Sequence, residues 1–489
     1  MERIAIRIAL VIALLALGGE ALADAPEFGG IAVFGGHTAG RAGALSDLLA
    51  VTSADSASAY VFLNGERIDG GAVAGAVRNG AMSRDKSSAV LLTQECGLYF
   101  ITDGAVTAVD GNVRSYQLAL DGGAVAYTTQ DRALKVYSPQ NGVELICEDF
   151  DDRWDDPDYK NYGRAYAISP DGVVVYAVRG ALHYYAGGVY AEASGEQPLM
   201  LGILCANHGA NIVYVNGADT IATSMYYVAD RGELRKLPIP DINYEGSLSV
   251  DYADDGSALI ECASLEGGGQ ACATYISTNG EPFAPLPFQD AIVFMNREQP
   301  IQKCDTLMPV ESYAGCWVNS NFWDGHESFY YPAWLDENLN LRVPENVNEY
   351  FNSFVALEDD SLYVFRSDKK WVYLAGPDAA PAVVEGQPDD MPNLISHPGC
   401  RTLYFEKNGA LYPVADGSTG KPFDYNSYGD TMLTPEALYC FRPQDGGIAL
   451  VRRTPDGAQQ VLVDSLDDRV IQDMDLENFA GQRYNTASI

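Results

Sequence analysis

A phrase of turns and short strands recurs along this chain about every forty residues, and it limits the folds that the chain can adopt. Its clearest copy is ISPDGVVVYAVRGALHYYAGG, from Ile168 to Gly188. A Pro-Asp-Gly turn precedes a run rich in Val and Tyr, a short turn follows, and a second apolar run returns. Each copy therefore predicts a β-hairpin.

Looser copies of the phrase cover most of the chain. They begin at Met82, Ala119, Leu204, Tyr252, Ala356, Ser396 and Leu433. Their turns lie mostly 36 to 50 residues apart, and the gap of 104 residues between Asp255 and Asp359 leaves room for one more unit. A repeat of this length that is made of strands is typical of a β-propeller, in which each unit is one blade.

The strand runs favour the propeller over other all-β folds. VVVYAV and NIVYV are nearly continuous apolar runs, which need cover on both faces, as stacked blades provide. A β-sandwich would need several domains of about 100 residues with linkers between them, and a parallel β-helix would need a shorter repeat. The chain holds nine or ten hairpins, and some blades are expected to take two of them. We therefore predict an all-β, single propeller of seven or eight four-stranded blades.

The N-terminus has the pattern of a secretory signal peptide. Arg3 and Arg7 precede an apolar run at residues 8–17, and small residues follow at 21–23. The run is shorter than the ~20 residues that span a membrane. We predict a signal peptide at 1–23, a propeller at 24–489, and a secreted, periplasmic or cell-surface location. Ring closure is expected from a strand at Gly30–Gly35 in the blade that contains Val461–Val463.

The charge of the chain restricts its partners. Asp and Glu number 67 against 31 Lys and Arg, for a net charge of −36. Such a chain repels nucleic acids and anionic membrane surfaces, so neither is an expected partner. Nine cysteines are an odd number, so at least one stays unpaired. Cys262 and Cys272 flank a glycine turn and are predicted to face each other as a disulfide; Cys304 and Cys316 are a weaker pair.

The phrases SPDGVVVYAV and ALHYY resemble the WD40-like repeats of bacterial secreted and periplasmic propellers of the TolB type, and propellers likened to those of lipoprotein receptors. The GH and WD dipeptides of eukaryotic WD40 proteins are not repeated here. The resemblance implies a scaffold that binds proteins or small ligands at the faces of a ring. It supplies no catalytic residue.

The chain lacks two familiar catalytic motifs. It contains no GxSxG elbow and no sialidase-type Asp box, and its five histidines are scattered. His183, in a strand run, is expected to pack or to lie at a rim rather than to bind a ligand. The acidic stretch Asp149–Asp158 contains enough oxygen ligands for Ca²⁺ but lacks the EF-hand pattern. It predicts either a calcium loop or a solvated one, and no other cofactor is expected.

One aromatic segment departs from the repeat, SYAGCWVNSNFWDGHESFYYPAW, from Ser312 to Trp334. Its rings lie among amide and carboxylate groups, which suits the binding of sugars or peptide side chains. The alternative is that the rings fill the space between two blades. The predicted ligand-binding residues are Trp317, Asn319, Phe322, Trp323, Asp324 and His326.

The sequence therefore favours an exported binding or interaction module, whose ligand is a protein, a peptide or a glycan, over an enzyme. The alternative is a propeller-type glycan hydrolase or lyase that uses carboxylates near the ring axis. A purely structural envelope protein is the third hypothesis.

Overall fold

A computed structural model gives the fold of the chain. It describes residues 28–33, 45, 47–53, 58–68, 73–83, 86–119, 121–150, 166–169, 172–178, 181–192, 205–206, 211–216, 222–229, 233–237, 248–252, 257–264, 271–278, 281–286, 292–294, 297–299, 303–306, 312–323, 328–344, 351–357, 359–366, 368–389, 392–395, 402–424, 432–433, 437–444, 447–466 and 487–488. The structure in these ranges is β-strand, turn and coil. None of the described residues forms a helix that could cross a membrane. The predicted signal peptide and the C-terminal residues 467–486 lie outside these ranges.

The strands of the first half of the chain form five antiparallel sheets in sequence order. The first contains β1 (Phe28–Val33), β2 (Leu48–Ser53), β3 (Ser58–Leu63), β4 (Glu66–Arg67) and β5 (Val73–Ala74). The second contains β6 (Val77–Met82), β7 (Ser88–Thr93), β8 (Leu98–Thr102) and β9 (Ala105–Asp110). The third contains β10 (Val113–Leu118), β11 (Val125–Thr129), β12 (Leu134–Ser138) and β13 (Gly142–Cys147). The fourth contains β14 (Tyr166–Ile168), β15 (Val174–Val178), β16 (Ala181–Ala186) and β17 (Val189–Glu192). The fifth contains β18 (Cys205–Ala206), β19 (Asn211–Asn216), β20 (Ala222–Ala229) and β21 (Glu233–Leu237).

The second half continues the same plan. The sixth sheet contains β22 (Leu248–Tyr252), β23 (Ala258–Ser264), β24 (Ala271–Ser277), β25 (Ala284–Pro285) and the C-terminal β45 (Ala487–Ser488). A hairpin of β26 (Ile292–Phe294) and β27 (Arg297–Gln299) follows. The seventh contains β28 (Lys303–Thr306), β29 (Cys316–Trp323), β30 (Ser328–Leu335) and β31 (Leu341–Arg342). The eighth contains β32 (Phe351–Ala356), β33 (Leu362–Arg366), β34 (Trp371–Leu374) and β35 (Ala382–Val383). The ninth contains β36 (Asn393–Ile395), β37 (Leu403–Lys407), β38 (Ala410–Ala415), β39 (Ser418–Thr419) and β40 (Phe423–Asp424). The tenth contains β41 (Met432–Leu433), β42 (Leu438–Gln444), β43 (Gly447–Arg453) and β44 (Gln459–Leu466).

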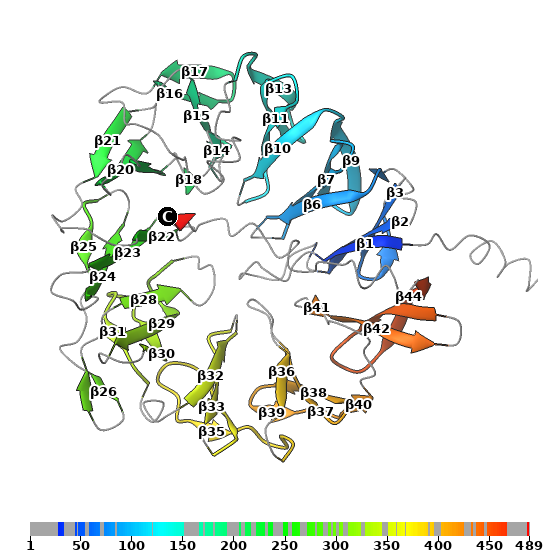
Figure 1. Ribbon diagram of the computed structural model, residues 1–489, viewed down its shortest axis with the longest axis vertical. Coiled ribbons are helices and arrows are strands. Elements are labelled where there is room, and N and C mark those ends of the chain that lie inside the picture. Colours follow the sequence, from blue (N-terminus) through cyan, green and yellow to red (C-terminus); the bar gives the residue numbers. More distant parts are fainter. Residues whose placement is uncertain are drawn as a thin grey trace, which may run out of the picture.

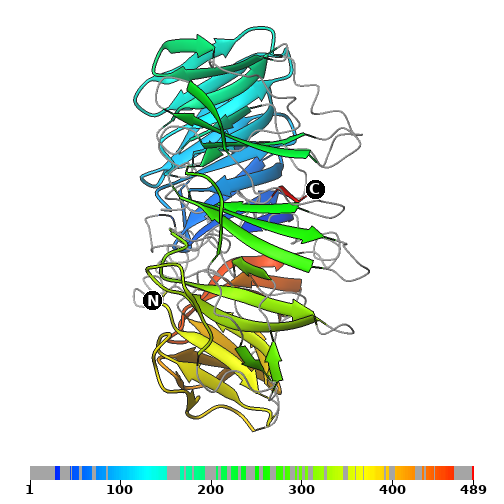
Figure 2. The same cartoon turned by 90° about the vertical axis from the view of Figure 1, so that its left-hand side faces the viewer.

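The sheets follow one another around a ring, with the earlier strands of a sheet nearer the middle and the later ones outside, except that β45 lies on the inner side of β22 in the sixth sheet (Figure 1). Seen from the side, the ring is a flattened disc (Figure 2). The predicted all-β propeller is therefore confirmed, but seven or eight blades are not. The described residues form ten sheets of four or five strands. The predicted number of blades was too low because each hairpin of the repeat has its own inner and outer strand and does not share a blade with a second hairpin.

The recurring phrase forms the second and third strands of a sheet together with the turns around them. In the fourth sheet, SPDG is the turn between β14 and β15, and ALHYYA is β16. In four of the described sheets the turn between the first and second strands has this form: the fourth turn residue donates its N–H to the carbonyl of the first and has a positive φ. These fourth residues are Lys86, Gly122, Gly172 and Asp360, with φ of 54°, 73°, 82° and 62°.

The core of the molecule lies between consecutive sheets. Every residue of β7 and β11 is buried, which explains why the strand runs are continuously apolar. One apolar cluster joins the second and third sheets through Leu92, Phe100, Val113 and Tyr127, and similar clusters join the first sheet to the second, the third to the fourth and the eighth to the ninth. Blade contacts therefore account for most of the apolar residues in the repeat.

Side chains join the first and last sheets, and no strand is exchanged between them in the described pairing. β1 pairs with β2, and β44 pairs with β43, so the predicted pairing of Gly30–Gly35 with Val461–Val463 is replaced by side-chain contacts. The carboxylate of Asp47 accepts a hydrogen bond from the Tyr439 hydroxyl and forms a two-point ion pair with Arg452. An apolar cluster of the same two sheets includes Leu49, Tyr439 and Phe441. The burial of Tyr439, followed by the charge of Asp47, raises the pKa of this phenol well above its usual value.

Candidate functional site

The predicted aromatic segment forms a hairpin of β29 and β30 inside the seventh sheet. Trp317 is only 2% exposed, and its ring meets that of Trp334, its cross-strand partner, edge to face at 5.2 Å. Its indole Nε1 donates a hydrogen bond of 2.9 Å to the carbonyl of Asp360 in the eighth sheet. Both tryptophans pack with Leu362 and Val364 of that sheet. Trp317 therefore fills the space between two blades, as the alternative interpretation of this segment predicted.

The other predicted residues of this segment are only partly placed. Asn319, Phe322 and Trp323 lie on β29, opposite Pro332, Phe329 and Ser328 of β30. Asp324 and His326 lie outside the described residues. The segment thus belongs to a regular sheet, which is the unit that the gap in the repeat left room for, and a role of these five residues in binding stays a prediction.

The acidic stretch is described only at its start. Asp149 pairs with Arg132 at 3.1 Å, and both side chains are exposed. Residues 151–158 lie outside the described ranges. Within those ranges, no three His, Cys, Asp or Glu residues come together as metal ligands. The calcium loop stays a prediction.

Three further sequence predictions can be compared with the structure. The register of β23 and β24 places Cys262 opposite Ala273 and Cys272 opposite Ala263, so the two cysteines are not cross-strand partners. In this register the two cysteines are one residue out of step. Cys316 is not part of a disulfide, and its Sγ donates a hydrogen bond of 3.3 Å to the carbonyl of Tyr313, so the predicted pair with Cys304 is not formed. His183 stacks on Tyr176 with ring centroids 5.4 Å apart, which agrees with a packed histidine.

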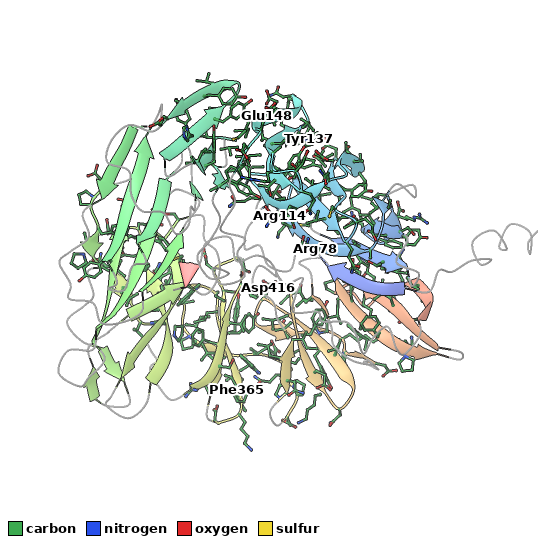
Figure 3. All side chains as sticks on the ribbon, turned by 45° about the horizontal axis from the view of Figure 1, so that its top comes forward. Arg78, Arg114, Tyr137, Glu148, Phe365 and Asp416 are labelled. Atoms are coloured by element: carbon green, nitrogen blue, oxygen red, sulfur yellow. The ribbon has the colours of Figure 1, made fainter. Side chains whose placement is uncertain are left out.

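The inner strands of two neighbouring sheets carry arginines that the sequence search missed. Arg78 on β6 and Arg114 on β10 each follow a buried valine, Val77 and Val113, at a β-bulge. A bulge turns a side chain out of the normal alternation. Figure 3 shows both arginines on the side of their sheets that faces the middle of the ring. The enzyme hypothesis predicted carboxylates there, and these two positions hold cations instead. Both arginines precede the repeat turn of their sheet by the same number of residues. This equal spacing was the signal in the sequence that could have identified them.

A second group lies at the outside of the ring. Six large apolar side chains are exposed among the described residues, and four of them lie on β13 and β17, the outer strands of two neighbouring sheets. These four form what we call the outer rim: Val143 (45% exposed), Leu145 (43%), Val189 (57%) and Tyr190 (53%). Apolar side chains gathered on a surface often mark a site of interaction with another protein.

Tyr190 connects the two strands of the outer rim. Its hydroxyl donates a hydrogen bond of 2.8 Å to the backbone carbonyl of Leu145. Its ring contacts that of Tyr185 with centroids 4.8 Å apart. Burial, followed by a hydrogen bond to Glu144, raises the pKa of Tyr185. Tyr190 is therefore an exposed aromatic ring held in place at two points, which lowers the entropy cost of binding through it.

The sheets and their arrangement define the chain as a β-propeller protein. No family model and no curated protein matches it. Among solved structures, dipeptidyl peptidase 4 of Porphyromonas gingivalis is similar at 10% identity, with a TM-score of 0.44, over 87% of this chain and 66% of that one. The Dos1 propeller is similar at 10% identity and a TM-score of 0.32, over 74% and 88%. The GH74 xyloglucanase of Xanthomonas campestris is similar at 12% identity and a TM-score of 0.26, over 89% and 86%. No functional residue is transferred at these levels of similarity.

Proposed function

We propose that the protein is an exported binding module, active at the cell envelope or outside the cell, which recognises a partner protein through the outer rim. The observation that carries this proposal is that four of the six exposed large apolar side chains of the described residues lie on β13 and β17, the outer strands of two neighbouring sheets. The other outer strands with an exposed large apolar residue, β35 and β44, have one each within the described residues. An isolated apolar residue is ordinary on a protein surface, whereas a group on adjacent strands is typical of an interface.

The propeller suits this role because its backbone is uniform while its surface residues vary. The four equivalent turns keep the same hydrogen bond and carry Lys86, Gly122, Gly172 or Asp360 at the same position. Rigid strands hold such variable positions in fixed geometry, as binding scaffolds require. The predicted signal peptide supports export, and the net charge of −36 supports a partner that is neither nucleic acid nor membrane.

The proposal is tested by probing the purified chain against protein, peptide and glycan arrays, beside Val189→Lys and Val383→Lys. Val383 is the matched control, since it is a valine that is 53% exposed on β35, the outer strand of another sheet. We expect the wild type and Val383→Lys to bind the same proteins or peptides, and Val189→Lys to lose them. Equal binding by all three chains, binding to glycans alone, or turnover of a glycan would contradict the proposal.

A further inference from the structure

The free edge of β17 narrows the class of partner. β17 pairs with β16 on one side and is the last strand of its sheet in the described pairing. Its register places Tyr190 opposite Tyr185 and Val189 opposite Ala186, so Tyr190 and Val189 lie on opposite faces of the sheet. An exposed strand edge with apolar groups on both faces is a template for an added strand.

The neighbouring outer strand offers less of such an edge. The carbonyl of Leu145 on β13 already accepts the Tyr190 hydroxyl. A strand that paired along β13 would compete with that hydrogen bond, whereas pairing along β17 leaves it intact. The hydrogen bond of Tyr190 therefore favours β17 over β13 as the edge to which a partner strand is added.

The charges around the outer rim determine the charge of the partner. Glu144 lies between Val143 and Leu145, Glu148 follows β13, and Glu192 ends β17, two residues after Tyr190 and on the same face. Figure 3 shows Glu148 at the outside of the ring. A second copy of this chain has the same acidic side chains at its own outer rim and the same net charge of −36. Electrostatic complementarity therefore favours a cationic partner over self-association.

We propose that an extended segment of a basic partner protein adds to the free edge of β17, with alternating basic and apolar side chains. The basic side chains lie over the Tyr190 ring and beside Glu192, where a cation gains both a π face and a carboxylate. The apolar side chains lie on the other face beside Val189. This inference rests on the proposed binding function and adds the partner's chemistry and the mode of pairing.

The probe is an acetylated, amidated peptide of alternating lysine and valine, titrated against the full chain by fluorescence anisotropy. We expect binding that weakens with added salt, since screening reduces charge attraction. Val189→Lys should weaken it by at least about ten-fold, the loss of roughly 1.4 kcal/mol of contact, and Val383→Lys by less than about two-fold. Glu192→Gln should weaken it less than Val189→Lys.

Three companion measurements could overturn the inference. A glutamate–valine peptide that binds as tightly would contradict the role of charge, and the lysine–valine peptide N-methylated at every residue should not bind, because it lacks backbone donors for a strand ladder. Equal binding of the methylated peptide, a dimer of the chain in light scattering, or no binding of the lysine–valine peptide would each reject strand addition. If the array experiment still shows binding that depends on Val189, the proposed function stands and only this inference fails.

Discussion

The aromatic segment of the seventh sheet and the outer rim of the third and fourth sheets differ in how well the sequence predicts which side chains are exposed. The aromatic segment has three of the five tryptophans of the chain, yet Trp317 is buried between two blades. The outer rim is made of ordinary residues of the repeat, yet its four apolar side chains are exposed. In a ring of stacked sheets, aromatic residues are used mainly where blades meet, and exposed apolar groups remain where the last strand of a sheet has no neighbour.

The largest effect is expected from Trp317→Ala. The change removes a large ring from the contact of the seventh and eighth sheets and leaves the carbonyl of Asp360 without its indole donor. Large-to-small changes of this kind destabilise a fold by about 4 kcal/mol. Thermal unfolding followed by circular dichroism measures the loss. A change below about 1 kcal/mol would mean that Trp317 is not part of the core.

The second-largest loss of stability is expected from a change in the polar contact between the first and last sheets. Asp47→Asn removes the charge that balances Arg452 in a buried position and should cost about 3 kcal/mol. The matched control is Asp110→Asn, since Asp110 receives the same kinds of group, Tyr127 and Lys135, between the second and third sheets. That contact is more exposed, so about 1 kcal/mol is expected there. Equal losses in urea unfolding would show that the first and last sheets have no special dependence on this contact.

A smaller, pH-dependent effect is expected at Tyr363, on the strand against which Trp317 packs. Burial raises the pKa of Tyr363 to about 12; the charges of Tyr373, Asp359 and Asp416 also raise it, while the N–H of Gly417 lowers it. The neutral phenol therefore stabilises the fold fully below pH 10, and this contribution is lost as the pH rises from 10 towards 12. The loss amounts to about 2 kcal/mol. In Tyr363→Phe the melting temperature should fall less steeply between pH 9 and 11, as measured by calorimetry; an identical slope would contradict the burial of this phenol.

The smallest effect on stability is expected at the outer rim. Val189→Lys and Val383→Lys should each change the free energy of unfolding by less than about 0.5 kcal/mol, because both side chains lie mostly in solvent. The two variants should differ in partner binding alone. A loss of stability in Val189→Lys comparable to that of Trp317→Ala would show that the outer rim is structural.

The sequence was sufficient to predict the architecture because a turn motif and a continuous apolar strand are local signals. The hairpin of SPDGVVVYAV and ALHYY is formed as expected, and the unit missing from the repeat is the sheet of β28–β31. The number of blades could not be read, because the short inner and outer strands, such as β14 and β17, have weak patterns. The prediction that Cys262 and Cys272 face each other was wrong, because the presence of glycines between two strands does not determine their register to within one residue.

The site was harder to predict because exposure is not a local property. Trp317 and Tyr190 are both aromatic residues in strand runs, and nothing in their immediate neighbours separates them. What separates them is position within a sheet: Trp317 is on the second strand, covered by the next blade, while Tyr190 is on the last strand, at the edge. The distinction depends on which strand of its sheet each run forms, which the pattern of the run alone did not reveal.

Hydroxyl-radical footprinting of the folded chain tests this contrast most directly, because it needs no ligand. Tryptophan is intrinsically the more reactive side chain, so exposure alone can reverse the order. With Tyr190 53% exposed and Trp317 2% exposed, we predict that Tyr190 is oxidised at least about ten times faster than Trp317. Oxidation of Trp317 at the rate of Tyr190 or faster would contradict the account, since the aromatic segment would then be an accessible surface.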